Sequence, residues 1–323
     1  MNKAMKIWLI IATSAVLLGV IVFGVAMSAL NWDFRKLETA RFETNEHEIS
    51  EQFHNIKIKT DTADILFVIS DDNQCRVVCY EETKAKHSVS VVDDTLVINA
   101  IDNKAWYDYI GLRFSSPEIT VYLPSAAYNS LTIDDSTGDI EIPKEIRFNS
   151  MDISVSTGDV RCDASATGAI QIKTTTGDIQ VEDITAESLK LSASTGEVKA
   201  SGVSCKGDFG ITVSTGKAKL SDIRCQNLMS TGSTGDISLL NVIAAEKVSV
   251  NRSTGDVRFD GLDADEIFVK TSTGDVRGTL LSEKVFIVST STGKKDVPAT
   301  ITGGRCEIKS STGDIIITIS QAS

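Results

Sequence analysis

The sequence predicts an all-β protein: a parallel β-solenoid of about ten rungs with an N-terminal β cap, preceded by one transmembrane helix. Three patterns carry this prediction: a Ser/Thr-Thr-Gly-Asp tetrad that recurs every 19 or 20 residues, alternating apolar residues between the tetrads, and one uncharged apolar run near the N-terminus. A short, strict period indicates one small unit stacked on copies of itself. The tetrad glycines, which we expect to be structural turn residues, are Gly138, Gly158, Gly177, Gly196, Gly216, Gly235, Gly255, Gly274, Gly293 and Gly313.

The chain begins with the predicted membrane helix. Lys3 and Lys6 precede an uncharged apolar run over residues 7–30, which as a helix would span about 36 Å and cross a hydrocarbon core of about 30 Å. A cleaved signal peptide with its peptidase site at Ala26-Met27-Ser28 is the alternative, and both interpretations export the rest of the chain. The predicted divisions are a cytoplasmic tail (1–6), a signal-anchor helix (7–30), a stem (31–45), a capping β region (46–135) and the repeat solenoid (136–323).

The region before the repeats carries similar strands with less regular spacing. Residues 56–58 and 65–68 alternate or run apolar, and Ala63 stands where the repeats have glycine. Terminal repeats are atypical because they must cover the end of the stack. We therefore expect a β cap that is continuous with the solenoid.

One segment before the repeats, residues 106–114, concentrates aromatic side chains, which make up only 6% of the chain. Exposed aromatic clusters commonly form contact surfaces for a partner, a glycan or membrane headgroups. Packing over the open first rung is the alternative interpretation. The candidate contact residues are Trp106, Tyr107, Tyr109 and Phe114.

Each repeat is predicted to form two or three short strands bent around turns. Apolar residues lie two and four positions after the glycine, as in Ile179 and Val181, and this alternation indicates strands with one buried face. Equivalent side chains such as Ile179, Ile237 and Val257 should then stack directly above one another. The predicted turn residues between the strands are Asp183, Gly202, Asp222, Asn241 and Gly261.

The C-terminal segment, residues 315–319, is an apolar strand with no visible cap. An apolar strand at an open edge invites pairing with another chain. We therefore expect Ile315, Ile317 and Ile319 to form an edge interface, either with a partner or with a second copy of this chain.

Six cysteines are few for a disulfide-stabilised scaffold of this size. Cys205 and Cys225 each follow a repeat glycine by nine residues, so stacking would place their Cα atoms about 4.8 Å apart, within disulfide range. Cys75 and Cys79 have no histidine close in sequence, which argues against a metal site there. The alternative to the disulfide is a column of small buried residues that also includes Ala186, Ala244 and Ala264.

The residue after each repeat glycine is acidic, except at Lys217 and Lys294, and is Glu197 in one repeat. One carboxylate per rung is typical of calcium-binding β-rolls, whereas basic residues two positions further on favour a solvated charge lattice. We expect the lattice and no cofactor, with calcium as the alternative. The predicted ion pairs are Asp159 with Arg161, Asp256 with Arg258, and Asp275 with Arg277.

Charge and histidine placement exclude several function classes. The net charge of −12 argues against nucleic acid or anionic lipid as the main partner. The three histidines, His47, His54 and His87, all precede the repeats, and the sequence suggests no Ser-His-Asp or Cys-His set. We therefore predict a non-enzymatic protein without catalytic residues, and an enzyme acting on envelope glycans is the least favoured class.

Residues 53–58, 60–65, 106–114 and 121–124, together with the repeat array, resemble a bacterial family known as the "putative adhesins", a domain of unknown function. The resemblance covers nearly everything from residue 42 onward. It implies a single-pass cell-membrane protein whose extracytoplasmic domain is an adhesin or a structural or binding element of the envelope, with an unknown protein or glycan ligand. The alternative is an accessory protein of an envelope-stress signalling system that acts through a membrane partner.

Overall fold

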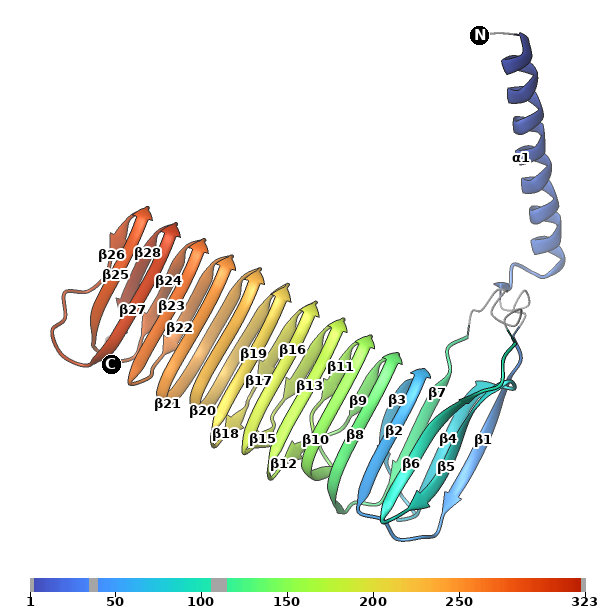
Figure 1. Ribbon diagram of the computed structural model, residues 1–323, viewed down its shortest axis with the longest axis horizontal. Helices are drawn as coiled ribbons and strands as arrows, with labels where there is room; N and C mark the ends of the chain where they lie inside the picture. The colour runs from blue at the N-terminus through green and yellow to red at the C-terminus, as the bar shows by residue number, and fades with distance from the viewer. Residues whose placement is uncertain (1–2, 35–39, 106–114, 321–323) are drawn as a thin grey trace.

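The computed structural model describes residues 3–34, 40–105 and 115–320 and shows a long β rod whose N-terminal end carries one helix (Figure 1). Helix α1 (Lys3–Ala29) is apolar along nearly its whole length, and almost all of its side chains are exposed. At 1.5 Å per residue it spans about 40 Å. The prediction of one N-terminal apolar helix is confirmed, and the helix begins at Lys3 rather than at residue 7.

The strands fall into groups by their place in the rod. The cap comprises β1 (Phe42–Ile49), β4 (Cys75–Glu82) and β5 (Ala85–Val92), and the first two rungs comprise β2 (Asn55–Thr62), β3 (Asp64–Ile69), β6 (Thr95–Asp102) and β7 (Glu118–Leu123). The strands that lead into the glycine corners are β8 (Ala127–Thr137), β10 (Arg147–Thr157), β13 (Ala169–Thr176), β16 (Ser188–Thr195), β19 (Asp208–Thr215), β23 (Glu266–Thr273), β25 (Lys284–Thr292) and β27 (Gly304–Thr312). The strands that leave these corners are β9 (Ile140–Ile142), β11 (Val160–Cys162), β14 (Ile179–Glu182), β17 (Val198–Ser201), β22 (Val257–Leu262), β24 (Val276–Leu280), β26 (Lys295–Asp296) and β28 (Ile315–Ile319). Short strands β12 (Ser165–Ala166), β15 (Thr185–Ala186) and β18 (Ser204–Cys205) follow, and β20 (Ala218–Thr234) and β21 (Ile237–Thr254) run from one glycine corner to the next.

Successive rungs pair in parallel and in register, which confirms the predicted β-solenoid. Ile237 pairs with Val257, and Ile179 pairs with Val198 on the next rung. These inward side chains are fully buried, whereas their neighbours along each strand face outward. The alternation therefore builds one continuous core along the rod, because each rung covers the apolar face of the one below.

The repeat glycines form one corner column, and at each glycine position a Cβ atom would meet the backbone of the neighbouring rung. Gly196 has φ of 145°, and a Cβ atom there would lie 2.0 Å from the carbonyl oxygen of Gly177 on the preceding rung. Only glycine tolerates both the positive φ and the approach of the neighbouring backbone. Ala63 occupies the same column one rung earlier, since a Cβ on Gly138 would lie 2.2 Å from its carbonyl oxygen.

A second corner column contains the predicted turn residues. Its members adopt left-handed backbone conformations, with φ between 51° and 68°. Asparagine, aspartate and glycine are the residues that adopt this conformation at least cost. The column consists of Asp183, Gly202, Asp222, Asn241 and Gly261.

The region before the repeats supplies two further parallel rungs and an antiparallel cap. β2 pairs in parallel with β8 and β6, and β3 pairs in parallel with β9 and β7. Strands β5 and β4 then pair antiparallel with β6 and β7, and β1 pairs antiparallel with β4. The change of direction ends the parallel stack at this end of the rod (Figure 1).

At the other end, the last two rungs are stacked in the reverse of their order in the sequence. β27 pairs with β23 on one side and with β25 on the other. β28 likewise lies between β24 and β26. The rung that contains Gly293 is therefore the outermost, and the rung that contains Gly313 lies inside it.

This strand order contradicts the predicted open edge at the C-terminal strand. β28 pairs along its whole length with β24, and Ile315 and Ile316 also pair with β26. Ile315 and Ile317 are buried, and Ile319 is half-buried. The prediction assumed that rungs stack in chain order, which would have left the last strand outermost. The outermost long strand is instead β25, whose Ile287 is 47% exposed.

Candidate functional site

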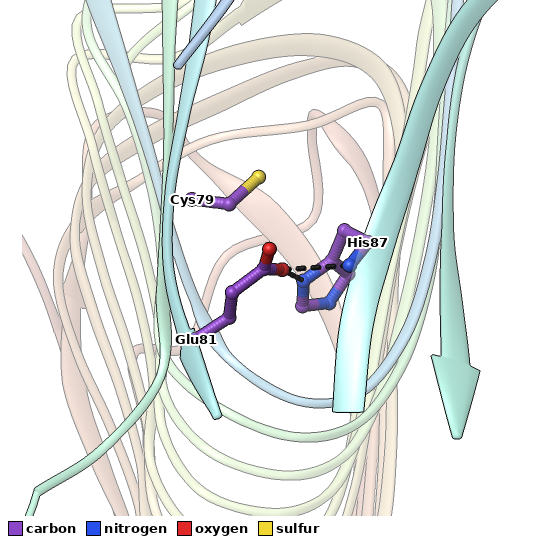
Figure 2. A group of neighbouring side chains, drawn as sticks. All are labelled: Cys79, Glu81 and His87. Carbon is purple, nitrogen blue, oxygen red and sulfur yellow. Dashed lines mark hydrogen bonds and ion pairs between the residues drawn. The ribbon is translucent and has the colours of Figure 1, made fainter. Parts of the chain in front are cut away.

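Three side chains of metal-binding types gather inside the N-terminal cap (Figure 2). Cys79 and Glu81 are alternate residues of β4, so both point to its inner face, and His87 comes from the neighbouring strand β5. Their exposed fractions are 0%, 1% and 9%. The thiol sulfur, a carboxylate oxygen and an imidazole nitrogen all lie within 4.8 Å of one another.

Glu81 is held in place by hydrogen bonds to both of its carboxylate oxygens. Its Oε2 atom accepts the main-chain N–H of His87 at 2.6 Å and lies 2.8 Å from the imidazole Nδ1 atom. Its Oε1 atom accepts a hydrogen bond from Asn45 Nδ2 at 2.7 Å, across the β1–β4 pair. A buried carboxylate needs such partners because burial without them is costly.

The other imidazole nitrogen of His87 contacts a hydroxyl on the first parallel rungs. Its Nε2 atom lies 2.9 Å from Thr60 Oγ1, so both ring nitrogens have a partner. Thr60 and His87 line a cavity of about 190 Å³, together with the ion pair of Glu82 and Lys104. His87 therefore lies in the wall of a cavity, whereas Cys79 and Glu81 are buried behind it.

The hydrogen-bonded residues Thr60, His87 and Glu81, with Cys79 beside them, suit two kinds of chemistry. Thr60, His87 and Glu81 follow the order hydroxyl, imidazole, carboxylate that hydrolase triads use, but Thr60 is 3% exposed and poorly placed for a polymeric substrate. A thiol, an imidazole and a carboxylate are also the ligand types that transition metals prefer. Burial, with the charge of Glu81 added, raises the pKa of the Cys79 thiol to about 12, so in the absence of a metal it is a protonated, unreactive thiol.

Sequence reasoning missed this cluster. No histidine lies close to Cys79 in sequence, yet His87 approaches it across the β4–β5 hairpin. The hairpin was the available signal, because a turn between Glu82 and Ala85 brings residues on its two sides together.

A second buried acid, Asp135, lies on the rung next to Thr60. It is 2% exposed, pairs in register with Thr60, and its Oδ2 atom has no hydrogen-bond partner. Burial raises the pKa of Asp135 to about 7, assisted by the charges of Asp64 and Asp61 and opposed by hydrogen bonds from main-chain N–H groups. This carboxyl therefore changes protonation state near neutral pH.

The remaining predicted site residues are placed as follows. Trp106, Tyr107, Tyr109 and Phe114 lie outside the described residues. The repeat glycines occupy the corner column, as predicted. Cys205 and Cys225 are free, buried thiols in the column of small residues, next to each other because Ser204 pairs with Arg224.

The acidic residues after the repeat glycines connect successive rungs. Asp159 Oδ1 accepts the main-chain N–H of Asp178 at 2.7 Å, and Asp178 Oδ1 accepts that of Glu197 at 2.7 Å. At these corners one carboxylate oxygen is thus used by the scaffold. The same bond joins Asp64 to Asp139, Asp139 to Asp159, Asp236 to Asp256, Asp256 to Asp275, Asp275 to Asp314, and Asp314 to Lys294.

Two of the three predicted ion pairs are present on the surface. Arg258 Nη2 lies 2.6 Å from Asp256 Oδ2, and Arg277 Nη2 lies 2.9 Å from Asp275 Oδ2. Arg277 Nη2 also lies 3.2 Å from Oδ2 of Asp314, the next carboxylate of the column. Such bridging relieves repulsion within a column of like charges.

The third predicted pair, Asp159 with Arg161, is wrong. Arg161 Nε instead lies 3.1 Å from Asp163 Oδ2, and its Nη2 atom lies 4.0 Å from Glu182 on the next rung. The side chain turns away from the corner because these two carboxylates offer it partners further along the strand.

Comparisons with known proteins identify the family. Three solved structures with similar folds are a "putative adhesin" from Bacteroides fragilis (16% identity, TM-score 0.43, 86% of this chain and 97% of that one), a "putative lipid binding protein" from Parabacteroides distasonis (14%, 0.47, 88% and 98%) and a "putative adhesin" from Parabacteroides merdae (13%, 0.46, 75% and 97%). No curated protein matches the chain. The family model described as Toastrack DUF4097 matches residues 53–212 and 205–323, which together make up most of the chain. The protein therefore belongs to the Toastrack DUF4097 family.

Proposed function

We propose that this protein is a non-enzymatic, extracytoplasmic binding or structural element of the bacterial cell envelope, held at the cell membrane by α1. The observation that carries the proposal is the junction of two unlike parts: an exposed apolar helix and a long solenoid with one continuous core. A solenoid of this kind resists bending because neighbouring rungs share hydrogen bonds and core contacts along their length.

The helix supports the membrane assignment by its length and surface. It offers about 40 Å of apolar side chains with almost none buried against the protein. Lys3 and Lys6 lie at its N-terminal end, which favours a cytoplasmic N-terminus. The rod would then lie outside the cytoplasm, with its N-terminal cap nearest the membrane.

Two measurements test this placement. Intact-mass analysis of the protein purified from membranes should show that residues 7–30 are retained, whereas a mature chain that starts after Ser28 would identify a cleaved signal peptide. Deletion of residues 3–29 should release the rod into the soluble fraction. Retention of the shortened protein in washed membranes would contradict anchoring by α1.

We propose that the aromatic segment with Trp106, Tyr107, Tyr109 and Phe114 is the contact surface for the partner. In the sequence it lies between β6 and β7. A photo-crosslinking residue at position 107 should capture an envelope glycan or a surface protein in cells. Capture of a membrane kinase or transporter would instead favour a role as an accessory in envelope-stress signalling.

A matched control distinguishes this contact from nonspecific crosslinking at any aromatic position. Phe268 is an aromatic residue on the outer face of β23, where Lys247 and Arg305 approach its ring at 4.5 and 5.4 Å. The same photo-crosslinking residue at position 268 should give no specific product. Equal capture from positions 107 and 268 would contradict a dedicated contact surface at residues 106–114.

A further inference from the structure

We propose that Cys79, Glu81 and His87 bind one zinc ion inside the N-terminal cap. Their three ligand atoms converge from two adjacent strands and lie within 4.8 Å of one another (Figure 2). Ligand atoms around a tetrahedral zinc ion lie about 3.5 Å apart, given bonds of about 2.0 to 2.3 Å. The longest separation therefore needs to shorten by about 1 Å. His87 Nδ1 and Glu81 Oε2, now 2.8 Å apart, need to separate by about 0.7 Å, and rotation of the side chains can provide both changes.

The ligand types select a metal of the zinc class. A thiolate with an imidazole and a carboxylate suits zinc, whereas calcium and magnesium prefer oxygen ligands alone. The charges also balance, because one thiolate and one carboxylate neutralise a divalent cation. A neutral assembly matters here since Cys79 and Glu81 are almost completely buried, and an uncompensated buried charge is costly.

The surrounding hydrogen bonds resemble the outer shell of a metal site. Metal-binding histidines usually donate their other ring N–H to a fixed acceptor, and Thr60 Oγ1 lies 2.9 Å from His87 Nε2. Binding carboxylates are usually held in place in turn, and Asn45 holds Glu81 Oε1 at 2.7 Å. Thr60 and Asn45 come from strands on either side of the cluster and would orient two of its three ligands.

The proton balance of binding follows from these contacts. Before binding, Cys79 carries its thiol proton, and a proton lies between His87 Nδ1 and Glu81 Oε2. On binding, the thiol proton is released to solvent, and the imidazole proton moves from Nδ1 to Nε2. The Nε2–H group then donates a hydrogen bond to Thr60 Oγ1. The thiolate sulfur, Nδ1 and a carboxylate oxygen are then free to bind the metal, and a water from the adjoining cavity can occupy the fourth position.

Cobalt(II) tests this site directly, because it substitutes for zinc and absorbs visible light. The full-length protein in detergent, reduced and stripped of metal, should bind one equivalent of Co²⁺. We expect a sulfur-to-cobalt charge-transfer band together with the ligand-field bands of a tetrahedral centre, and Zn²⁺ should abolish both. Binding without the charge-transfer band would overturn the assignment of Cys79 as a ligand.

The chain offers a matched pair of cysteines for the variants. Cys75 is buried on the same inner face of β4 but lies outside the cluster. Cys79→Ser should remove the charge-transfer band, and Cys75→Ser should leave the band and the affinity unchanged. Thr60→Val should retain the band and weaken zinc affinity by roughly 10- to 100-fold, as expected when an outer partner of a ligand is lost.

One measurement needs no variant and so does not depend on variant folding. X-ray absorption at the zinc edge of the wild-type complex should show one sulfur scatterer with nitrogen or oxygen neighbours. A first shell of oxygen alone, or failure of the folded wild-type protein to take up one equivalent of either metal, would overturn the proposal.

Discussion

Asp314 Oδ1 accepts the main-chain N–H of Lys294 at 2.9 Å, although Lys294 comes earlier in the chain. Everywhere else in this column the acceptor belongs to the earlier rung. The reversal arises because the rung with Gly293 is stacked outside the rung with Gly313. Lys294 thus stands on the outermost rung, where no further main-chain N–H needs a carboxylate acceptor, so a lysine there costs the scaffold no hydrogen bond.

The strand order predicts opposite tolerances at two isoleucines. Ile317 is 3% exposed inside the last rungs, so Ile317→Lys should lower the free energy of unfolding by about 3–5 kcal/mol, because it buries an uncompensated charge. Ile287 is 47% exposed on the outermost strand, and Ile287→Lys should change stability by no more than about 0.5 kcal/mol. Urea unfolding of both variants measures the difference. If the two substitutions cost the same, the stacking order described above is wrong.

The corner carboxylates should contribute to stability through their acceptor oxygens rather than their charge. Asp178→Ala removes the acceptor for the Glu197 N–H and should destabilise the protein by about 0.5–1.5 kcal/mol. Asp178→Asn retains an oxygen in this position and should cost clearly less. Lys294→Ala is the matched control, since it loses only an exposed ion pair with Asp296, worth about 0–1 kcal/mol. An equal loss for Asp178→Ala and Asp178→Asn would show that charge, not hydrogen bonding, is what matters.

Two nearby glycines distinguish a required corner from an ordinary strand position. Gly196→Ala places a Cβ atom 2.0 Å from the Gly177 carbonyl oxygen at a positive φ, and should cost about 2–5 kcal/mol. Gly210→Ala meets no atom closer than 4.0 Å and should leave stability unchanged or raise it by roughly 0.5 kcal/mol. Thermal unfolding followed by circular dichroism compares them. Comparable melting temperatures for the two variants would contradict the close contact at the corner.

The parts of the fold that the sequence predicts correctly are those set by local pattern. The glycine period, the alternation around residues such as Ile179, and the left-handed turn at Asp183 each depend on residues within one rung. Their physical causes are local sterics and the two-residue period of a strand. The conformation of each rung can therefore be predicted from its own 19 or 20 residues.

What the sequence does not predict is which rungs become neighbours. All rungs carry the same pattern, so β27 is as suitable a partner for β23 as β25 is, and the stacking order has no local signature. A lysine in the acid column does not mark the end of the stack either, because Lys217 stands inside it and Lys294 on the outermost rung. The cap cluster was missed for a similar reason, since Cys79 and His87 meet across a hairpin rather than along one strand.

Asp135 should make the stability of the rod decrease as the pH rises. Burial raises the pKa of this carboxyl from 3.8 to about 7 in the folded protein, so between these values the folded state holds a proton that the unfolded state has lost. The stabilising effect of this proton is complete below about pH 4 and declines up to about pH 7. The total change is on the order of 4 kcal/mol, at about 1.4 kcal/mol per pH unit.

The variant Asp135→Asn removes this titration and retains an oxygen for the main-chain N–H of Thr137, which Asp135 Oδ1 accepts at 3.2 Å. We expect the variant to match the wild-type protein near pH 4 and to exceed its free energy of unfolding at pH 8. Asp134→Asn is the matched control, because Asp134 is next to Asp135 in sequence but its side chain is exposed on the outer face of β8. Urea unfolding at pH 4, 6 and 8 checks the trend. A constant difference between Asp135→Asn and wild type across this range would show that Asp135 does not titrate with the raised pKa, since only a proton held by the folded state makes the difference grow with pH.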